Sequence, residues 1–379
     1  MTSSEPFEIF LVGLPGLESV LAQEATQRGF SGVEPVAGGV VCRGGWTEVW
    51  RANLEMRGAS RVLVRIAAFR APHLAQLDKR CRKVDWKAFL APEIPVTVEA
   101  SSKRSRVYHT GAIRQRVEGA LKDQLGAKIT PDAGLCLRVR LDDDLCTISI
   151  DTSGDPLHRR GHKQAVNKAP MRETMAAQFL LACGYRPGEP LVDPMCGSGT
   201  FVIEAAEMTL GLQAGRSRSF AFEQLPSFDA GAFDSLRTHA AVERNPAKTL
   251  FWGSDRDAGA IEMSRANAER AGVGTSMRVE HHAISDLQRP PLDEPGLVIV
   301  NPPYGDRIGD KNKLKALYAS FGKIMAQRFA GWRVGLITDD NQLARSTGLP
   351  FKKPTSPIPH GGLKVKLFQT GPLRSSAGP

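Results

Sequence analysis

Cysteine is scarce in this sequence and is not arranged for metal binding. The 379 residues contain six cysteines, and no two of them form a Cys-x-x-Cys pair. Because structural zinc sites hold their ligands at such short, fixed spacings, no metal site is predicted. The cysteines are instead expected to be free thiols in a reducing compartment; they are Cys42, Cys81, Cys136, Cys146, Cys183 and Cys196.

Long apolar runs and a targeting segment are also absent. A membrane-spanning helix needs roughly 20 consecutive apolar residues, and no stretch approaches that length. The first six residues contain no basic segment followed by an apolar run, which a signal peptide would require. The sequence therefore predicts a cytoplasmic protein that does not bind a membrane.

The remaining composition is that of a globular protein with a basic balance. Hydrophobic residues make up 41% and charged residues 24% of the chain, which suits two or three domains with a core each. The 50 Lys and Arg against 40 Asp and Glu give a net charge of +10. A positive charge of this size favours a polyanionic partner without requiring one.

Secondary-structure patterns divide the chain into four parts. Residues 1–68 show a β-α-β-α-β order, and residues 69–154 form a second α/β unit that ends in a hairpin around Asp142-Asp143-Asp144. Residues 155–170 are polar and basic and are expected to be a linker. Over 171–379 strands and helices alternate, which is typical of a doubly wound, mainly parallel sheet, with an expected insertion at 211–250.

The first functional motif is Asp193-Pro-Met-Cys-Gly-Ser-Gly-Thr200, at the junction of a predicted strand and helix. Gly197 and Gly199 allow a tight turn and a close approach of the backbone to a ligand, and the helix that begins near Thr200 points N–H groups at that ligand. A plain strand-to-helix turn would also use these glycines. The motif, however, lacks the third glycine of a dinucleotide site, and its acid precedes the glycines.

Acidic residues at the ends of the following strands favour a nucleoside ligand. Asp255 is placed to accept hydrogen bonds from two ribose hydroxyls, and Asp286 to accept one from an adenine amino group, whereas Asp257 is expected to cap a helix. The predicted S-adenosylmethionine site therefore consists of Asp193, Pro194, Gly197, Ser198, Gly199, Thr200, Asp255 and Asp286.

The second motif, Asn301-Pro302-Pro303-Tyr304, follows the apolar strand 297–300 and predicts the chemistry. Two consecutive prolines stiffen the loop, so that the Asn301 side-chain oxygen and the Pro302 carbonyl can bind the two hydrogens of an exocyclic base amine. Tyr304 would stack on the base. Alone, the motif could be an ordinary loop, but together with the glycine motif it predicts a methyltransferase that acts on such an amine by positioning and electrostatics.

The two motifs resemble those of the THUMP-domain RNA guanine-N2 methyltransferases, which modify 23S ribosomal RNA or tRNA. Residues 157–162, 169–174 and 220–229 are similar to further segments of that family. The resemblance implies a ferredoxin-like unit over 1–68, a THUMP unit over 69–154 and a Rossmann-like methyltransferase domain over 171–379. It also implies that Pro170 lies against the cofactor and that the target is the N2 amine of guanosine.

A basic stretch in the N-terminal half supplies the candidate RNA contacts. The predicted RNA-binding residues are Lys103, Arg104, Arg106, Arg114, Arg159 and Arg160. Each of them could equally be a solvated surface charge. Two other functions stay open from the sequence: an adenine-N6 methyltransferase acting on RNA or DNA, and a non-catalytic RNA-binding or assembly factor. A monomer is expected.

Overall fold

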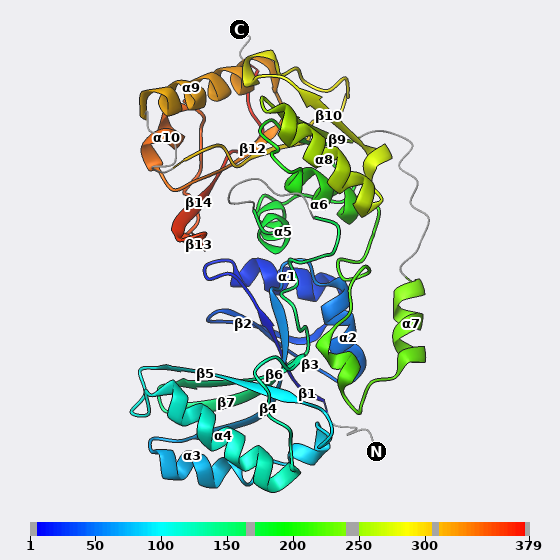
Figure 1. The fold of residues 1–379 in the computed structure, drawn as a ribbon. Helices are drawn as coiled ribbons and strands as arrows, with labels where there is room; N and C mark the ends of the chain where they lie inside the picture. Colours follow the sequence, from blue (N-terminus) through cyan, green and yellow to red (C-terminus); the bar gives the residue numbers. More distant parts are fainter. Residues whose placement is uncertain (1–5, 164–170, 240–249, 305–310, 376–379) are drawn as a thin grey trace. The chain divides into compact units, whose positions relative to one another are not determined.

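The fold is given by a computed structural model, which describes residues 6–163, 171–239, 250–304 and 311–375. The chain forms two compact units and passes between them several times (Figure 1). The N-terminal unit holds Met1–Gly13, Leu21–Leu157 and Gly215–His239. The C-terminal unit holds Leu14–Val20, His158–Ala214 and Ala240–Pro379.

The N-terminal unit is built on one seven-stranded sheet with the order β2-β3-β1-β4-β7-β6-β5. Only β5 and β6 pair in parallel; the other neighbours are antiparallel. The strands are β1 (Phe7–Val12), β2 (Ser31–Val36), β3 (Gly39–Gly44), β4 (Arg61–Arg70), β5 (Val96–Lys103), β6 (Leu135–Asp142) and β7 (Leu145–Asp151). The helices are α1 (Glu18–Gln27), whose first residues belong to the other unit, α2 (Trp46–Glu55), α3 (Leu74–Cys81), α4 (Thr110–Leu125) and α7 (Ala230–His239).

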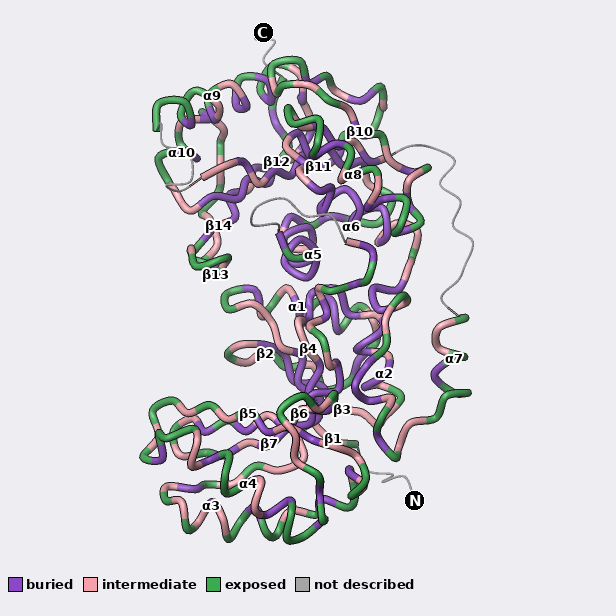
Figure 2. The backbone as a smooth tube through the Cα atoms, viewed as in Figure 1, coloured by how far each residue is buried: buried purple, intermediate pink, exposed green. Residues whose placement is uncertain are grey.

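Strand alternation places the core of this unit on one face of the sheet. In β6 the alternate residues Leu135, Leu137, Val139 and Leu141 are buried, while the residues between them are partly or fully exposed. This period of two is what a half-buried antiparallel strand requires. In Figure 2 the buried residues of this core are drawn in purple.

The sheet of the N-terminal unit is continuous, although the sequence predicts separate units over 1–68 and 69–154. The expected boundary falls inside β4, which pairs with β7 from Leu63 to Arg70. Because one strand belongs to both predicted units, they share a sheet and a core rather than meeting at a linker.

The insertion also departs from the predicted domain limits. Residues 215–239 pack in the N-terminal unit, not in the domain predicted over 171–379. Phe222, Phe228 and Phe233 meet one another and the Trp50 ring of α2 at centroid distances of 5.1–6.4 Å. The apolar residues of the insertion therefore complete the core beside α2.

The C-terminal unit has a second seven-stranded sheet, with the order β10-β9-β8-β11-β12-β14-β13. The first five strands are parallel, as the alternating pattern predicts, and the last two add an antiparallel edge. The strands are β8 (Leu191–Asp193), β9 (Phe251–Asp255), β10 (Met277–His281), β11 (Leu297–Val300), β12 (Arg333–Thr338), β13 (Ile358–His360) and β14 (Leu363–Gln369). The helices are α5 (Glu173–Ala182), α6 (Thr200–Thr209), α8 (Ala258–Ala271), α9 (Lys311–Arg328) and α10 (Asn341–Ser346).

The central strand β11 shows why this sheet forms. All four of its residues, Leu297 to Val300, are buried, because apolar clusters cover both faces of the strand. The strand leads directly into Asn301, so a rigid element carries the predicted catalytic loop to the carboxyl edge of the sheet.

The predicted linker is in part an ordered piece of the C-terminal unit. Residues 158–163 group with that unit, and Arg160 and His162 are buried in it. Residues 155–157 of the predicted linker group with the N-terminal unit, and residues 164–170 lie outside the described residues. All six cysteines are free thiols, as the sequence predicts, and none is exposed.

Candidate active site

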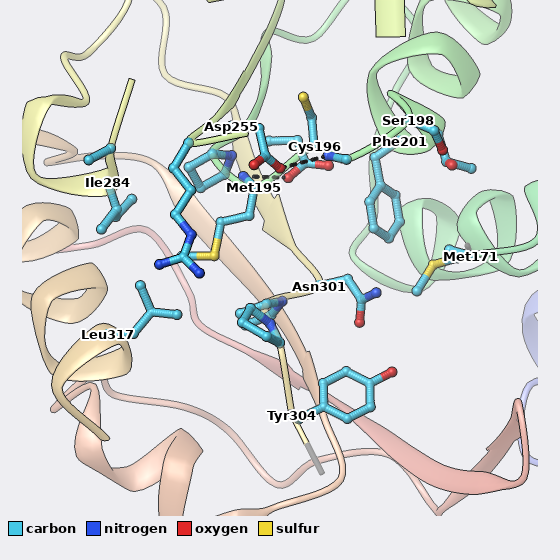
Figure 3. A pocket seen from close by; sticks show the side chains of 18 of the residues that line it. Met171, Met195, Cys196, Ser198, Phe201, Asp255, Ile284, Asn301, Tyr304 and Leu317 are labelled. Carbon is cyan, nitrogen blue, oxygen red and sulfur yellow. Dashed lines mark hydrogen bonds between the residues drawn. The ribbon is translucent and has the colours of Figure 1, made fainter. Parts of the chain in front are cut away.

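A cavity of about 500 Å³ lies at the carboxyl edge of the parallel sheet of the C-terminal unit (Figure 3). Its volume is in the range typical of small-molecule sites. It is lined by residues that follow β8, β9 and β11, which is where open α/β sheets bind their ligands. Both predicted motifs contribute to its wall.

The glycine loop adopts the conformation that its sequence requires. Gly197 and Gly199 have φ angles of +54° and +83°, which L-residues with a side chain rarely adopt. A Cβ on Gly199 would come within 3.1 Å of the Ser264 hydroxyl oxygen, whereas a Cβ on Gly197 would meet nothing within 4 Å. Gly197 also lines the cavity. Its bare backbone thus leaves room that a ligand can fill.

Helix α8 holds this loop from behind. The Ser264 hydroxyl donates to the Gly197 carbonyl oxygen at 2.7 Å, and the Asn267 side-chain amide donates to the Ser198 carbonyl oxygen at 3.1 Å. Two loop carbonyls are therefore satisfied by side chains of α8, which fixes the loop before any ligand binds. The sequence did not single out Ser264 or Asn267.

Asp193 lies at the cavity wall with little access to solvent. It is 2% exposed, and burial raises its pKa to about 8. That pKa already includes a hydrogen bond from the Met195 backbone N–H, which lowers it, and a smaller contribution from the nearby Asp255 carboxylate, which raises it. A buried carboxyl of this kind favours a cationic neighbour in the cavity.

Asp255 also lines the cavity, and backbone groups orient its carboxylate. One oxygen accepts from the Gly197 N–H and the other from the Asp257 N–H, both at 3.0 Å. A carboxylate has lone pairs for further donors, so its predicted contact with ribose hydroxyls stays a prediction. Asp257 caps α8 by accepting from the Gly259 N–H at 2.9 Å.

Asp286 is the cofactor residue that the structure does not place in the site. It is exposed and is not among the residues that line the cavity. Instead His282, Ala283 and Ile284 line it, because the chain after β10 passes the cavity before it reaches the 3₁₀ turn at Ile284–Asp286. Asp286 therefore lies outside the wall of the ligand-free cavity, and its predicted contact with adenine stays a prediction. Pro170 lies outside the described residues.

The catalytic motif stands opposite the glycine loop, and Asn301, Pro302, Pro303 and Tyr304 all line the cavity. The side-chain oxygen Oδ1 of Asn301 is buried and has no hydrogen-bond partner among the described residues. Figure 3 shows the Asn301 side chain among Phe201, Met171 and Tyr304. An unpaired buried acceptor is costly, so this atom is set to receive a donor.

Tyr318 anchors the loop and was missed by the sequence analysis. Its buried hydroxyl lies 3.3 Å from the Pro303 carbonyl oxygen and 3.3 Å from the Thr338 hydroxyl oxygen. Burial raises the pKa of this phenol, so it stays protonated and can donate. Helix α9 and strand β12 thereby fix the two-proline loop between them.

The β13–β14 hairpin closes one side of the cavity and was also missed. His360, Gly361 and Leu363 line the cavity from it. Its two-residue turn consists of Gly361 and Gly362, both with positive φ, as a type I′ turn requires. The pair Gly361-Gly362 is the sequence signal for this turn. Nothing in the sequence indicates that the turn lies near a cavity whose other lining residues come from 171–317.

Two of the basic residues of the predicted linker serve the fold of this unit. Arg160 is 1% exposed, and its Nη1 lies 2.5 Å from Glu204 Oε2 and 3.4 Å from Glu207 Oε2, both on α6. The Lys163 ammonium donates to the Met171 carbonyl oxygen at 2.7 Å and to Thr200 Oγ1 at 2.9 Å. A phosphate cannot reach a guanidinium that is buried in this way, so the predicted RNA contact of Arg160 is wrong.

The other predicted RNA-binding residues remain accessible. Lys103, Arg104 and Arg106 are exposed around the end of β5, Arg114 is exposed on α4, and Arg159 is exposed in the C-terminal unit. Their contact with RNA stays a prediction. Within the described ranges no helix is long and apolar enough to cross a membrane, and no group of three or more His, Cys, Asp or Glu side chains is placed to hold a metal.

Two family models match the chain. Residues 160–352 match the RMKL-like methyltransferase domain, and residues 8–63 match the RlmL ferredoxin-like domain. The first match covers the cavity except for the β13–β14 hairpin. The second ends inside β4, in the middle of the continuous sheet.

Individual proteins similar to this chain are also named as methyltransferases. The chain is 33% identical to slr0064 of Synechocystis sp., provisionally named an RNA methyltransferase, over 93% of this chain and 94% of that one. It is 34% identical to the ribosomal RNA large subunit methyltransferase K/L of Syntrophotalea carbinolica, over 96% of this chain but 53% of that one. The chain thus spans about half the length of the K/L relatives. The crystal structure of SMU.472 complexed with SAH superposes with a TM-score of 0.88 at 26% identity, over 99% of this chain and 100% of that one.

Proposed function

Because the chain belongs to the family of RMKL-like methyltransferases, we propose that it transfers a methyl group to the exocyclic N2 amine of a guanosine in RNA. The observation that carries this proposal is the Asn301 amide oxygen, a buried acceptor at the cavity wall that has no partner among the described residues. An unsatisfied buried acceptor costs about 1–3 kcal/mol. A base amine in the cavity would supply the missing donor.

The methyl donor is S-adenosylmethionine, whose sulfonium supplies an activated methyl group. The glycine loop fits this ligand: Gly197 leaves open space beside the cavity, and the buried Asp193 carboxyl favours a cationic neighbour. Asp255, oriented by two backbone N–H groups, offers an acceptor for hydroxyls. These residues bind and orient the donor, and the α8 side chains keep the loop in its binding conformation.

The catalytic loop would hold and orient the accepting nitrogen. The lone pair of a base amine is delocalised into the ring, which makes the amine a poor nucleophile. Asn301 Oδ1 and the Pro302 carbonyl oxygen would each bind one amine hydrogen, and this favours the pyramidal form whose lone pair points at the methyl group. The methylated amine is cationic and then loses one proton to water, so no strong base is needed.

Tyr304 and Tyr318 have separate tasks in this scheme. Tyr304 lines the cavity directly after the two prolines and would stack on the base. Tyr318 does not line the cavity; it is a positioning residue that holds the Pro303 carbonyl. A base in a helix must first leave its stack, which costs a few kcal/mol, and less in a loop.

Three observations support RNA as the substrate. The relatives of this chain carry names that refer to RNA or ribosomal RNA. The net charge of +10 suits a polyanion. Residues 69–154 resemble a THUMP unit, which would bind RNA. Because the K/L relatives are named for large-subunit ribosomal RNA, that RNA is the proposed substrate; because those relatives are about twice as long as this chain, tRNA is kept as the alternative.

The test uses RNA from cells that lack this protein. Purified protein is incubated with S-adenosylmethionine and either deproteinised large-subunit RNA or tRNA from those cells, and the digested nucleosides are analysed by mass spectrometry. We expect N2-methylguanosine to appear in one of the two RNAs. N6-methyladenosine would instead assign the adenine-N6 function and overturn the proposed base. A protein that binds RNA but shows no calorimetric binding of S-adenosylmethionine would be a non-catalytic factor.

A further inference from the structure

One end of the N-terminal sheet gathers features that the proposed function does not use. Among the described residues, only two large apolar side chains are exposed: Tyr108 at 80% and Leu145 at 43%. Tyr108 lies in the loop between β5 and α4, and Leu145 is the first residue of β7, directly after the β6–β7 turn. A single exposed ring needs no explanation by itself, but a ring beside several cations suits a partner that offers both a flat face for stacking and negative charge.

Hydrogen bonds join these two loops into one surface. The Asp143 N–H donates to the Lys103 carbonyl oxygen at 3.2 Å, the Arg106 N–H donates to Asp144 Oδ1 at 2.8 Å, and the Asp144 N–H donates to Ser105 Oγ at 3.0 Å. We call residues 103–108 together with 142–145 the loop platform. Because several bonds connect its halves, Tyr108 projects from an ordered base and not from an independent loop.

The backbone of the platform is unusual for its residue types. Arg104, Asp143 and Asp144 have φ angles of 50°, 54° and 59°, and they are the only non-glycine residues with positive φ in the described part of the chain. The two aspartates occupy a two-residue hairpin turn, where this conformation is ordinary. Arg104 has no such explanation, and glycine would be cheaper there. The conformation instead presents a guanidinium that is 66% exposed.

The residues of the platform carry three cations against three carboxylates, and the excess of positive charge comes from Arg70 and Arg140, which pair with these carboxylates from beside the platform. Five cations, Arg70, Lys103, Arg104, Arg106 and Arg140, surround three carboxylates, Asp142, Asp143 and Asp144. The Arg70–Asp143 and Arg106–Asp144 pairs span 3.7 and 3.8 Å in exposed positions. Arg104 is held more closely, with its Nη2 and Nε 2.7 and 3.1 Å from Asp142 Oδ1, although its side chain is 66% exposed. Exposed pairs contribute at most about 1 kcal/mol, so a phosphate can replace the carboxylate on these guanidinium groups.

We propose that the loop platform binds an unpaired segment of RNA, with one base stacked on Tyr108 and the flanking phosphates on Lys103, Arg104 and Arg106. An unpaired base exposes the flat face that a tyrosine ring stacks on, whereas a duplex buries its base faces and offers only phosphates and groove edges. The inference rests on the proposed RNA function for its ligand class. The inference adds that the RNA recognised is unpaired, and that Tyr108 distinguishes unpaired RNA from a duplex.

The experiment measures binding of the full chain to two labelled probes by fluorescence anisotropy: a 12-nucleotide oligouridylate and a 12-base-pair RNA duplex. The variants are Tyr108→Ala, Tyr108→Trp and Arg104→Gln, with Lys122→Ala on α4 as the control for loss of an exposed side chain in the same unit. Tyr108→Ala should weaken binding of the single strand about 5- to 150-fold, since stacking contributes about 1–3 kcal/mol per base, and leave duplex binding unchanged. Tyr108→Trp should retain the wild-type affinity.

The charged variant separates phosphate contacts from stacking. Arg104→Gln should weaken both probes and reduce the salt dependence of binding by about one counterion, while Lys122→Ala should behave as wild type. The inference is overturned if the unmutated chain does not bind the oligouridylate, or if Tyr108→Ala binds both probes as the wild type does or loses both equally. The last result would point to damage of the loop instead of loss of a stacking contact.

The methylation assay described above distinguishes this inference from the proposed function. If the chain methylates guanosine in RNA and Tyr108→Ala retains single-strand binding, the inference fails and the function stands. If no methylation occurs but Tyr108→Ala selectively loses the oligouridylate, the function fails and the inference stands.

Discussion

At the scale of single residues, the chemistry depends most directly on the Asn301 amide. Replacing Asn301 with Ala should lower kcat for RNA methylation by roughly 10²- to 10³-fold, comparable to the loss of one transition-state hydrogen bond. Binding of S-adenosylmethionine should be unchanged, since the donor is held by the glycine loop. Single-turnover kinetics and calorimetry measure the two quantities, with Gln342→Ala, an exposed amide on α10, as the matched control. Full activity of Asn301→Ala would remove this residue from the mechanism.

Asp193 gives the second residue-scale prediction, which concerns pH. Its carboxyl has a pKa of about 8 without ligand, so it is mostly protonated at pH 7. A bound cationic donor lowers that pKa, so binding should release a proton. Affinity for S-adenosylmethionine should then rise between pH 6 and 7.5. Calorimetry in buffers of different ionisation enthalpy counts the released proton, and Asp193→Asn should abolish both the release and the pH dependence.

The same pKa shift affects the stability of the ligand-free protein. In the unfolded chain Asp193 ionises near pH 4, while in the folded chain it holds its proton up to about pH 8. Between these values the folded state binds more protons, so the contribution of this group to stability falls as pH rises. A contribution that increased over this range would contradict the burial-driven shift.

At the scale of elements, the sequence predicts strands and helices better than their assembly. Helix 46–55 and the strands that end at Asp193 and Asp255 agree with the structure, because caps, glycines and apolar periods are local signals. The edge hairpin β13–β14 was missed, because β13 has only three residues and the loop before it contains three prolines. Its contribution to the cavity depends on pairing with β12, which no local pattern encodes.

Arg160 illustrates the same limit for a charged residue. A basic stretch predicts an exposed surface, yet its position against Glu204 and Glu207 on α6 becomes visible only in three dimensions. Glu204 and Glu207 are three residues apart on that helix and so point the same way. In the sequence, the available signal for a buried cation was this pair of glutamates on one side of an otherwise apolar helix.

The Arg160 pair leads to a prediction about the segment 158–163. Arg160→Ala would leave two buried carboxylates without their cation, which should destabilise the C-terminal unit by about 3–5 kcal/mol. Affinity for RNA, measured below the unfolding transition, should not change. Thermal unfolding and anisotropy test the two parts, and Arg159→Ala, the exposed neighbour, serves as control. If Arg160→Ala lost affinity for RNA but kept normal stability, Arg160 would be an RNA contact after all.

At the scale of the whole molecule, the path of the chain couples the two units. The stretch 215–239 leaves the methyltransferase unit, packs in the N-terminal unit and returns. Its aromatic residues surround the Trp50 ring, and Phe222 is fully buried among them. An insertion in the catalytic half of the sequence therefore stabilises the N-terminal unit. A division of the sequence into consecutive domains would assign these residues to the wrong unit.

This path predicts where a distant mutation acts. Phe222→Ala should destabilise the N-terminal unit by about 3–5 kcal/mol, the usual cost of removing a buried phenylalanine. Hydrogen exchange read by mass spectrometry should show lost protection in α2 and β4, while β8, β11 and β12 keep theirs. Phe351→Ala, a partly buried phenylalanine stacked edge-on against Phe368 in the C-terminal unit, is the converse control and should affect β12 and β14 instead. Equal loss of protection in both units after Phe222→Ala would contradict this prediction. It would show that the N-terminal and C-terminal units unfold together as one cooperative body.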